Sequence, residues 1–535
     1  MELKINNIEG TNFGTASNVY DVYRVKSNRN DFELIIDNLI LERYSNDPEL
    51  KEYIKSLPIE NKRIAILSLL SDDNALWMEI DKLLKKDLTS YERLKAIYNK
   101  LKEYVKIADV DRKGKGEVHT PFKELAEPMV RLVEKYDESF WKNKYNKVLD
   151  SSAGYGTFLI LAIYKFMVGL KDEIEDEEER YKWIVENCIY YGEIQSRSVF
   201  SWLMAIDPFD KYETNIYWGD FLSEDFDNHA KEIWQTTNWS LSIQNPPYNS
   251  PRKENNQSTD IYNLFVDKCQ KMCDKVLMVT PSRWFIKSSL SDFRNRMIND
   301  YGLVCINHID DNKFFENADV KGGISYFLLD KNHKSDKVLF NNEYLDLKKY
   351  DIIPNDLRKE TFSIISKIIN YNNIQYRFNT QSHFKVKTND KRLKDIGNVK
   401  CFVSKQKGNI KYLSNVDFTG TKIDKWKLMI PAACGKGGMS ENFYNRIEIG
   451  EPGDVCSESF VFFDFDSKEE LEVFKSYLET NFFSYLVRLR KIKQHVTSDI
   501  FKWVPDIDLL KKVDDDYLFK KYKLTSEEEK LIING

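Results

Sequence analysis

The 535-residue sequence lacks any apolar run long enough to cross a membrane as a helix. Its longest apolar run, from Phe158 to Leu170, covers about thirteen residues and is interrupted by Lys165, whereas a bilayer requires roughly 20. Residues 1–7 also lack the basic stretch followed by an apolar stretch that a secretory signal carries. We therefore expect a cytoplasmic protein with no membrane partner.

Cysteine pairs are missing too, which argues against two further classes of protein. The seven cysteines are odd in number and scattered, and none belongs to a Cys-x-x-Cys pair, so neither a disulfide framework nor a zinc site is expected. The acidic residues of 1–105 fall in helical patterns and not beside the Glu-x-Lys type of strand that a metal-dependent nuclease needs. We expect reduced thiols and no metal.

An excess of positive charge is absent as well. The formal net charge is −5, which does not by itself indicate a nucleic-acid binder. Because such binding depends on local basic surface, this total is only a weak constraint on the partner.

The first 105 residues are predicted to be helical. Apolar residues recur there at three-to-four spacing in Phe32–Tyr44, Ile64–Leu84 and Tyr91–Tyr104. Residues 106–335 instead alternate short apolar strands with helices, which is typical of a doubly wound, mostly parallel α/β sheet.

Residues 336–535 are predicted to form a mixed α+β region. They include an apolar strand over Ser459–Phe465 and a long helical pattern over Glu469–Arg490.

Thr120-Pro121, before the first strand of the α/β region, is predicted to start a helix that runs to about Lys135, with Thr120 as its N-cap.

Asn245-Pro246-Pro247-Tyr248 follows the apolar strand that includes Leu241. Two consecutive prolines fix φ twice and remove two backbone donors, so the chain beyond the strand is stiff. The Asn245 oxygen and the Pro246 carbonyl can accept both hydrogens of a planar amine, and Tyr248 offers a ring face for stacking. Ligands bind at this end of strands in open parallel sheets. The motif indicates a site for an aromatic amine, although a rigid turn with a half-buried Tyr would have the same sequence.

Three strand ends upstream carry acidic residues. Asp150 precedes the turn Gly154-Tyr-Gly156 and an apolar helix; because it would repel a pyrophosphate, this turn favours a ligand with a cationic end. Glu193 ends the second strand, where a carboxylate can accept the hydroxyls of a ribose. Asp220-Phe221 at the third suits the amine and ring of an adenine.

This order of motifs resembles that of the adenine-N6 DNA methyltransferases that use S-adenosylmethionine and carry Asn-Pro-Pro-Tyr, in their gamma arrangement. Gly116-Glu-Val-His-Thr-Pro121 resembles the first motif of that family and Asp150-Ser-Ser-Ala-Gly-Tyr-Gly-Thr-Phe158 the second. Glu193, Asp220-Phe221 and the Asn-Pro-Pro-Tyr segment resemble the following three. The resemblance covers residues 110–330 strongly and 400–510 loosely, and residues 1–105 lie outside it.

The resemblance implies a set of functional residues. The catalytic residues would be Asn245, Pro246, Pro247 and Tyr248. The residues that bind S-adenosylmethionine would be Val118, Thr120, Asp150, Ala153, Gly154, Gly156, Glu193, Asp220, Phe221 and Asn245. A flipped base would stack on Tyr248 and on Phe315, or on Phe314 in its place. The DNA contacts would be Arg252, Lys253, Lys321, Lys436, Arg488, Arg490 and Lys493, of which the last three are on a basic helix end that also complements a helix dipole.

One position departs from the family. Its second motif usually reads Asp-Pro-x-x-Gly-x-Gly, and Ser151 here replaces the proline. The glycines and the acidic residues are kept, so we expect cofactor binding to survive.

The resemblance implies a site-specific DNA methyltransferase, with a Rossmann-like catalytic domain over residues 106–335 and a target-recognition domain over 336–535. Its partners would be double-stranded DNA and, in a restriction-modification system, a separate cognate endonuclease. Accepting both amine hydrogens at Asn245 and Pro246 would make the nitrogen more pyramidal and aim its lone pair at the sulfonium methyl, so no strong general base is needed. Flipping the base costs a few kcal/mol, which stacking offsets by roughly 1–3 kcal/mol per ring.

Three other functions fit parts of the same pattern. RNA adenine and protein glutamine methyltransferases use the same amine geometry, but glutamine-modifying enzymes need little beyond the catalytic domain, and about 200 residues follow it here. A catalytically silent DNA-specificity subunit is opposed by the presence of Asn245, Asp150, Glu193 and Asp220 together. The DNA sequence that is recognised does not follow from the residues, because base readout depends on a few side chains in an irregular region.

Overall fold

The computed structural model describes residues 48–56, 74–111, 120–209, 211–250, 259–310, 322–404, 409–414, 420–435, 439 and 443–535. These residues form two compact units. The first unit contains the described residues up to Arg283 together with Asn295–Lys348, and the second contains Trp284–Arg294 together with Lys349–Gly535. The predicted division at residues 105 and 335 stays a prediction.

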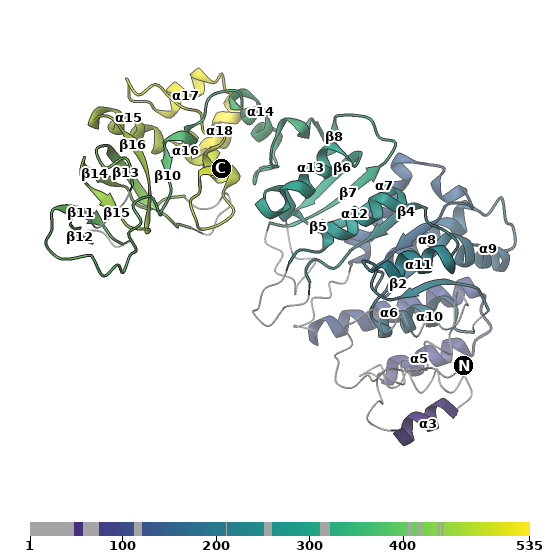
Figure 1. Cartoon of the computed structure of the whole chain (residues 1–535). Helices are drawn as coiled ribbons and strands as arrows, with labels where there is room; N and C mark the ends of the chain where they lie inside the picture. Colours follow the sequence, from purple (N-terminus) through teal and green to yellow (C-terminus); the bar gives the residue numbers. More distant parts are fainter. Residues whose placement is uncertain are drawn as a thin grey trace. The chain divides into compact units, whose positions relative to one another are not determined.

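A nine-stranded sheet forms the centre of the first unit (Figure 1). Its strands are β1 Val148–Asp150, β2 Ile189–Glu193, β3 Asn215–Trp218, β4 Trp239–Gln244, β5 Cys273–Pro281, β6 Leu303–Ile309, β7 Ile324–Asp330, β8 Val338–Phe340 and β9 Glu343–Leu345. They are arranged in the order β3-β2-β1-β4-β5-β7-β6-β8-β9. β7 is antiparallel to both of its neighbours and β9 to β8, while β1 to β5 pair in parallel. This mostly parallel Rossmann-like sheet confirms the predicted fold class.

The parallel strands have the sequence pattern of a sheet covered on both faces. Every residue of β1, β2 and β3 is buried, and strands that are covered on both faces are mostly apolar along their length instead of alternating. Because β3, β2, β1 and β4 are consecutive parallel neighbours, their carboxyl ends lie along the same edge of the sheet. The four strand ends that the sequence singled out are therefore adjacent.

The helices of the first unit, the last of which begins in the second, include those that connect and flank these strands. They are α3 Pro48–Ser56, α5 Asn74–Leu84, α6 Ser90–Asp111, α7 Glu127–Tyr136, α8 Thr157–Gly169, α9 Glu177–Trp183, α10 Ser196–Ile206, α11 Glu224–Glu232, α12 Tyr262–Met272 and α13 Ser291–Asn299. α8 is apolar on all sides and buried along most of its length, as expected of a core helix. Ile80 of α5 and Leu94 and Ile97 of α6 belong to the same apolar core as the sheet. The predicted helix over Phe32–Tyr44 lies outside the described residues.

The predicted start of the helix at Thr120 is wrong. The first turn is a π-helical one over Phe122–Ala126, its N-cap is Pro121, and no side chain caps it. The Leu125 and Ala126 amides both donate to the Pro121 carbonyl, so the backbone satisfies the turn without a side-chain cap. The Thr120 hydroxyl is consequently available to another group, which is described below.

The second unit contains two small sheets and a group of helices (Figure 1). Its strands are β10 Phe378–Asn379, β11 Val399–Phe402, β12 Ile410–Leu413, β13 Trp426–Pro431, β14 Glu448–Gly450, β15 Val455–Cys456 and β16 Phe460–Phe465. Its helices, besides the start of α13, are α14 Lys359–Ile368, α15 Lys468–Leu478, α16 Asn481–Arg490, α17 Asp515–Lys521 and α18 Ser526–Asn534. The sheets have the orders β10-β16-β13-β14 and β12-β11-β15. β16 confirms the strand predicted there.

The single helix predicted over Glu469–Arg490 is wrong, because the chain forms two helices there. α15 ends at Leu478, and the Thr480 hydroxyl accepts a hydrogen bond of 3.1 Å from the Phe483 amide at the start of α16. A side-chain cap of this kind replaces the intrahelical bond that a continuous helix would make. The apolar spacing continues across the break, and it therefore hid the boundary.

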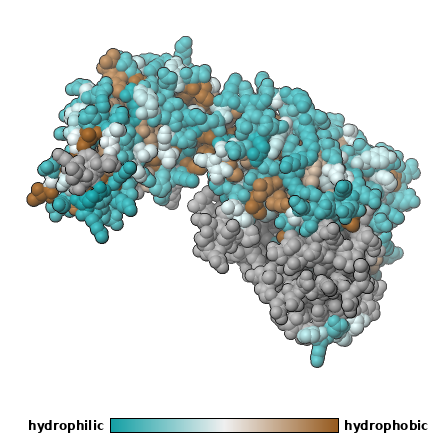
Figure 2. All heavy atoms as spheres, in the orientation of Figure 1, coloured by the Kyte–Doolittle hydropathy of each residue, from teal (hydrophilic) through white to brown (hydrophobic). Residues whose placement is uncertain are grey.

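Hydrophilic side chains cover most of the coloured surface in Figure 2, and hydrophobic ones appear there in small groups. Within the part of the chain that the structure describes, no helix combines the length and the apolar character that a membrane crossing needs. All seven cysteines are free thiols, and all but Cys434 are buried.

Candidate active site

The turn after β1 is built to bring the backbone close to other groups. Gly154 and Gly156 both have positive φ angles, of 51° and 79°, which residues other than glycine rarely adopt. A Cβ atom at Gly156 would lie 2.3 Å from the Trp202 ring of α10, so the ring lies directly against the turn. Trp202 is stacked on Tyr191 of β2, whose hydroxyl donates to the Gly154 carbonyl at 2.7 Å. Two aromatic rings thus fix the turn from the side of β2.

Two carboxylates lie at this turn. Asp150 is 1% exposed, and its Oδ1 accepts a hydrogen bond of 3.1 Å from the Ser152 amide. Glu193 accepts from the Gly154 amide at 2.8 Å and from two further amides that follow β2. Burial raises the pKa of Asp150 well above its ordinary value, although the Ser152 amide opposes this, and the charge of Glu193 adds to the rise. The two predicted acids are therefore brought together.

The third predicted strand end has a different character. Asp220 is half-buried, and its Oδ1 accepts a hydrogen bond of 2.9 Å from the Leu222 amide. The Phe221 ring is 2% exposed and packs against Phe226 and Phe265, with the Lys268 ammonium 5.0 Å from its centroid. Phe221 is thus a core side chain, and the Asp220 carboxylate is the more accessible group of the pair.

Asn245 follows the last residue of β4, as predicted. Its Nδ2 donates to the Thr120 hydroxyl at 3.2 Å, which links the Asn-Pro-Pro-Tyr segment to the segment predicted as the first motif. In this contact Nδ2 faces Thr120, and Oδ1 lies at the other end of the amide. Pro246 is buried and Pro247 is exposed. The prolines therefore hold the backbone at the rim of the sheet.

Tyr248 lies in the apolar core and is 8% exposed. Its carbonyl accepts a hydrogen bond of 3.2 Å from the Ile261 amide, and the next residue, Asn249, forms an isolated β-bridge with Asp260. Burial raises the pKa of the Tyr248 phenol, an effect that the charge of Arg283 opposes. A nucleobase would reach the face of the Tyr248 ring only after the groups that cover the ring move.

Sequence reasoning missed a buried polar group beside these residues. The Gln244 side chain is fully buried at the end of β4 and contacts Ser151 and Ser152 at the end of β1. A signal was present in the sequence, because polar residues alternate at Ser240, Ser242 and Gln244 in an otherwise apolar strand. Trp202 and Tyr191 were also missed, and they carry no motif by which they could have been found.

Four of the predicted DNA contacts lie outside the described residues, namely Arg252, Lys253, Lys321 and Lys436. So do three residues predicted to bind cofactor or base, namely Val118, Phe314 and Phe315. Lys493 is exposed. The Arg488 guanidinium is half-buried and donates to the carbonyls of Met439, at 2.6 Å, and Gly535, at 2.8 Å.

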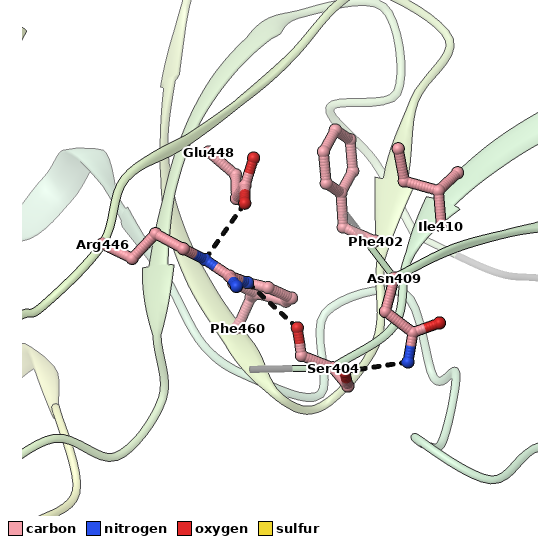
Figure 3. Close-up of a pocket in the computed structure, with 7 residues that line it drawn as sticks. All are labelled: Phe402, Ser404, Asn409, Ile410, Arg446, Glu448 and Phe460. Carbon is pink, nitrogen blue, oxygen red and sulfur yellow. Dashed lines mark hydrogen bonds and ion pairs between the residues drawn. The ribbon is translucent and has the colours of Figure 1, made fainter. Parts of the chain in front are cut away.

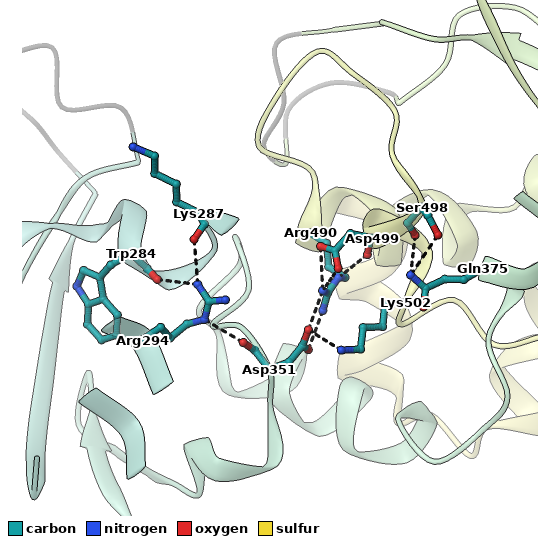
Figure 4. Close-up of polar contacts among 9 residues, drawn as sticks. All are labelled: Trp284, Lys287, Arg294, Asp351, Gln375, Arg490, Ser498, Asp499 and Lys502. Atoms are coloured by element: carbon teal, nitrogen blue, oxygen red, sulfur yellow. Dashed lines mark hydrogen bonds and ion pairs between the residues drawn. The ribbon is translucent and has the colours of Figure 1, made fainter. Parts of the chain in front are cut away.

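Arg490 is not a surface residue, which corrects the prediction that it contacts DNA. It is 2% exposed, and its guanidinium pairs with Asp351 at 2.9 Å and with Asp499 at 3.1 Å (Figure 4). It also lies 4.5 Å above the centroid of the Trp503 ring. Its donors and its flat face are thus used inside the second unit. Its position at the end of a basic helix reflects this internal cluster and not a phosphate.

A small pocket of the second unit also contains an arginine (Figure 3). It is lined by Phe402, Ser404, Asn409, Ile410, Arg446, Glu448 and Phe460. Arg446 pairs with Glu448 at 3.0 Å and donates to the Ser404 carbonyl at 3.0 Å. Because this guanidinium is already held by the fold, the pocket does not extend the candidate site.

Comparison with known proteins finds a family that matches part of the first unit. Residues 162–315 match the family described as Eco57I restriction-modification methylase. An uncharacterized adenine-specific methylase of Mycoplasma pneumoniae is 26% identical over 191 residues, which is 33% of this chain. The match spans 45% of that relative, less than half of its length.

Solved structures with a similar fold include restriction-modification proteins. A nuclease-deletion mutant of the Type ISP enzyme LlaGI, in complex with a DNA substrate mimic, is 14% identical with a TM-score of 0.48, over 93% of this chain and 67% of that one. A modification subunit of a putative type I restriction enzyme from Vibrio vulnificus YJ016 is 14% identical with a TM-score of 0.37, over 62% of this chain and 79% of that one.

Proposed function

We propose that this chain is a site-specific DNA methyltransferase that transfers a methyl group from S-adenosylmethionine to the N6 amine of a flipped-out adenine. The observation that supports this most is the position of Asn245-Pro246-Pro247-Tyr248 at the end of β4, next to the strand whose end carries Asp150. The proposed amine-binding motif and the buried Asp150 carboxylate are thereby neighbours on one sheet edge. The family of residues 162–315 supports the same reaction.

The residues at the turn after β1 fit the proposed cofactor. Burial of the Asp150 carboxylate raises its pKa and so disfavours its charged form, which a positive group beside it would stabilise, and S-adenosylmethionine carries positive charge. The positive φ angles of Gly154 and Gly156 keep side chains away from the turn. Asp150, Glu193 and Asp220 would hold the cationic end, the ribose and the adenine amine. When bound, this cofactor supplies an electrophilic methyl group.

Asn245 and Pro246 would bind the substrate amine. The Asn245 oxygen and the Pro246 carbonyl are preorganised acceptors, one oriented through Thr120 and the other held by consecutive prolines. Accepting both hydrogens concentrates the lone pair on the nitrogen, which a delocalised aromatic amine otherwise lacks. The proton leaves after alkylation, when the nitrogen has become acidic, so these residues need no adjacent base.

Tyr248 would stack on the flipped base, together with Phe315. Such stacking is worth roughly 1–3 kcal/mol per ring, comparable to the cost of flipping. Because Tyr248 is covered in this structure, its stacking requires a rearrangement around the ring as the base enters.

The second unit would read the DNA sequence. It is large enough to hold a recognition surface, and the exposed Lys493 is a candidate phosphate contact. The partner would be double-stranded DNA, with a separate cognate endonuclease if the protein belongs to a restriction-modification pair.

The proposed function is tested by offering the full chain radiolabelled S-adenosylmethionine with duplex DNA, RNA or protein as acceptor. We expect label in DNA, recovered as N6-methyladenine after digestion to nucleosides. Label in RNA or protein alone, or in none of the three, would overturn the proposal.

Asn245→Ala is expected to abolish transfer while it leaves cofactor affinity, measured by calorimetry, close to that of the parent. The matched control is Asn187→Ala, which removes a side chain that donates to the Trp183 carbonyl just before β2, away from the carboxyl edge of the sheet. Normal turnover in Asn245→Ala would remove that residue from the mechanism.

A further inference from the structure

A buried hydrogen-bond network joins the end of β1 to the end of β4. The Ser151 and Ser152 hydroxyls both donate to Oε1 of Gln244, at 2.8 and 3.0 Å. The same Ser152 hydroxyl lies 3.4 Å from the backbone oxygen of Asn245. The Ser152 amide donates to Asp150 at 3.1 Å. Ser152 therefore connects Asp150 to Asn245, and Ser151 and Ser152 together hold Gln244, the residue before Asn245.

The Gln244 side chain is saturated by this network. Besides the two hydroxyls that Oε1 accepts, Nε2 donates to the Ser242 hydroxyl at 2.7 Å and to the Cys269 sulfur of α12 at 3.1 Å. A primary amide can accept two hydrogen bonds and donate two, so all four are made. Fully satisfied buried polar groups rigidify their surroundings, because any shift leaves a donor or acceptor unpaired. Gln244 is thus fixed from three elements.

From these contacts we propose that Gln244 is a positioning residue that sets the spacing between the turn after β1, which would hold the cofactor, and Asn245. The inference rests on the proposed function, since the turn must hold a methyl donor for the spacing to matter. β1 and β4 pair only at two positions, Val148 with Leu241 and Leu149 with Ser242, so the backbone ladder stops before the strand ends. The Gln244 side chain continues the connection beyond the ladder, where Asp150 and Asn245 lie.

The same network gives a physical reason for the departure at Ser151. A proline at this position has no hydroxyl and could not donate to Gln244, so one of the four hydrogen bonds would be lost. Serine in place of proline therefore supplies a hydrogen bond that Gln244, the residue before Asn245, accepts. Ser151→Pro should accordingly slow methyl transfer by this protein, although it restores the residue usual in similar sequences.

Gln244→Leu is the direct test, because it introduces an apolar side chain of similar size and removes all four hydrogen bonds. We expect the single-turnover rate at saturating cofactor and DNA to fall roughly 10- to 100-fold, since a misplacement of about 1 Å between reacting groups has an effect of that size. Cofactor affinity, measured by calorimetry, should change much less than the rate. A merely structural role would lower thermal stability without this separation of rate from affinity, and an unchanged rate would overturn the proposal.

A double-mutant cycle distinguishes the network from two independent contacts. Ser151→Ala should slow transfer in the parent protein and have little further effect in Gln244→Leu, because its hydroxyl acts through Gln244. Additive effects would contradict the proposal. If Gln244→Leu does not fold, Ser151→Ala alone must still slow the single-turnover rate.

The control for the network is Ser325→Ala in β7, which removes a buried hydroxyl that has no hydrogen-bond partner among the described residues. It should leave the rate and the cofactor affinity unchanged. Failure of the proposed function is recognised separately, because the parent protein would then transfer no methyl group to DNA.

Discussion

At the scale of single residues, the two glycines of the turn after β1 differ in what surrounds them. A Cβ at Gly154 would meet nothing within 4 Å, whereas one at Gly156 would collide with Trp202 at 2.3 Å. Both substitutions pay about 1 kcal/mol of backbone strain for a positive φ, but only Gly156→Ala adds an overpacking cost of about 1–3 kcal/mol. We expect Gly156→Ala to lower the urea midpoint and the cofactor affinity more than Gly154→Ala does. Equal effects would show that Trp202 does not constrain the turn.

The raised pKa of Asp150 predicts how the free energy of unfolding changes with pH. Burial, and secondarily the charge of Glu193, raise its pKa, so the folded protein holds this proton more tightly than the unfolded chain does. The free energy of unfolding therefore falls as pH rises from the ordinary carboxyl pKa of about 3.9 towards the folded-state pKa. Asp150→Asn has no proton to lose, so without cofactor it should be more stable than the parent at neutral pH and should lose cofactor affinity. Urea unfolding at several pH values checks this, and an unchanged pH dependence would contradict it.

The placement of the candidate residues at the strand ends was predictable from sequence, and the reason is local. Asp150 and Glu193 each end a strand and Asn245 directly follows one, and parallel strands bring their ends to one edge, so order along the chain predicts neighbourhood in space. The partners of these groups were not predictable. Gln244 and Ser151 are 93 positions apart, and Arg490 meets Asp351 from 139 positions away. Such pairs depend on packing that no local pattern encodes.

At the scale of elements, the end of α16 makes the sharpest contrast between a buried and an exposed cation. Arg490 is enclosed by Asp351, Asp499 and Trp503, and its removal leaves two carboxylates without their shared partner. Truncating a buried pair typically costs about 3–5 kcal/mol; because both aspartates are partly exposed, we expect about 2–3 kcal/mol for Arg490→Ala. Urea unfolding of the full chain measures this loss.

The control on the same basic stretch is Lys493→Ala. Its side chain is exposed, so it should change the free energy of unfolding by less than about 0.5 kcal/mol. If it contacts a phosphate, it should instead weaken DNA binding for all sequences alike and reduce the salt dependence of that binding. A destabilisation as large as that of Arg490→Ala would contradict the distinction between the two cations.

At the scale of the whole molecule, the second unit is not one continuous piece of chain. Trp284–Arg294 belongs to it, although the first unit resumes at Asn295 and continues to Lys348. Arg294 is buried and donates to the carbonyls of Asp351, Trp284 and Lys287 (Figure 4), while the Ile353 amide donates to the Phe285 carbonyl at 3.0 Å. A short segment between β5 and β6 is thus part of the fold of the carboxyl-terminal residues.

A fragment of residues 349–535 should therefore be incomplete. It lacks the donor and acceptor that Arg294 and Phe285 supply to residues 351 and 353, and it exposes the apolar surface on which Ile286 packs. Joining residues 284–294 to the fragment through a flexible Gly/Ser linker should raise its melting temperature, and the same fusion with Arg294→Ala should raise it less. Because an unpaired buried carbonyl costs about 1–3 kcal/mol, the difference should be measurable by thermal unfolding. A bare fragment as stable as the fusion would show that the inserted segment is not needed for this unit to fold.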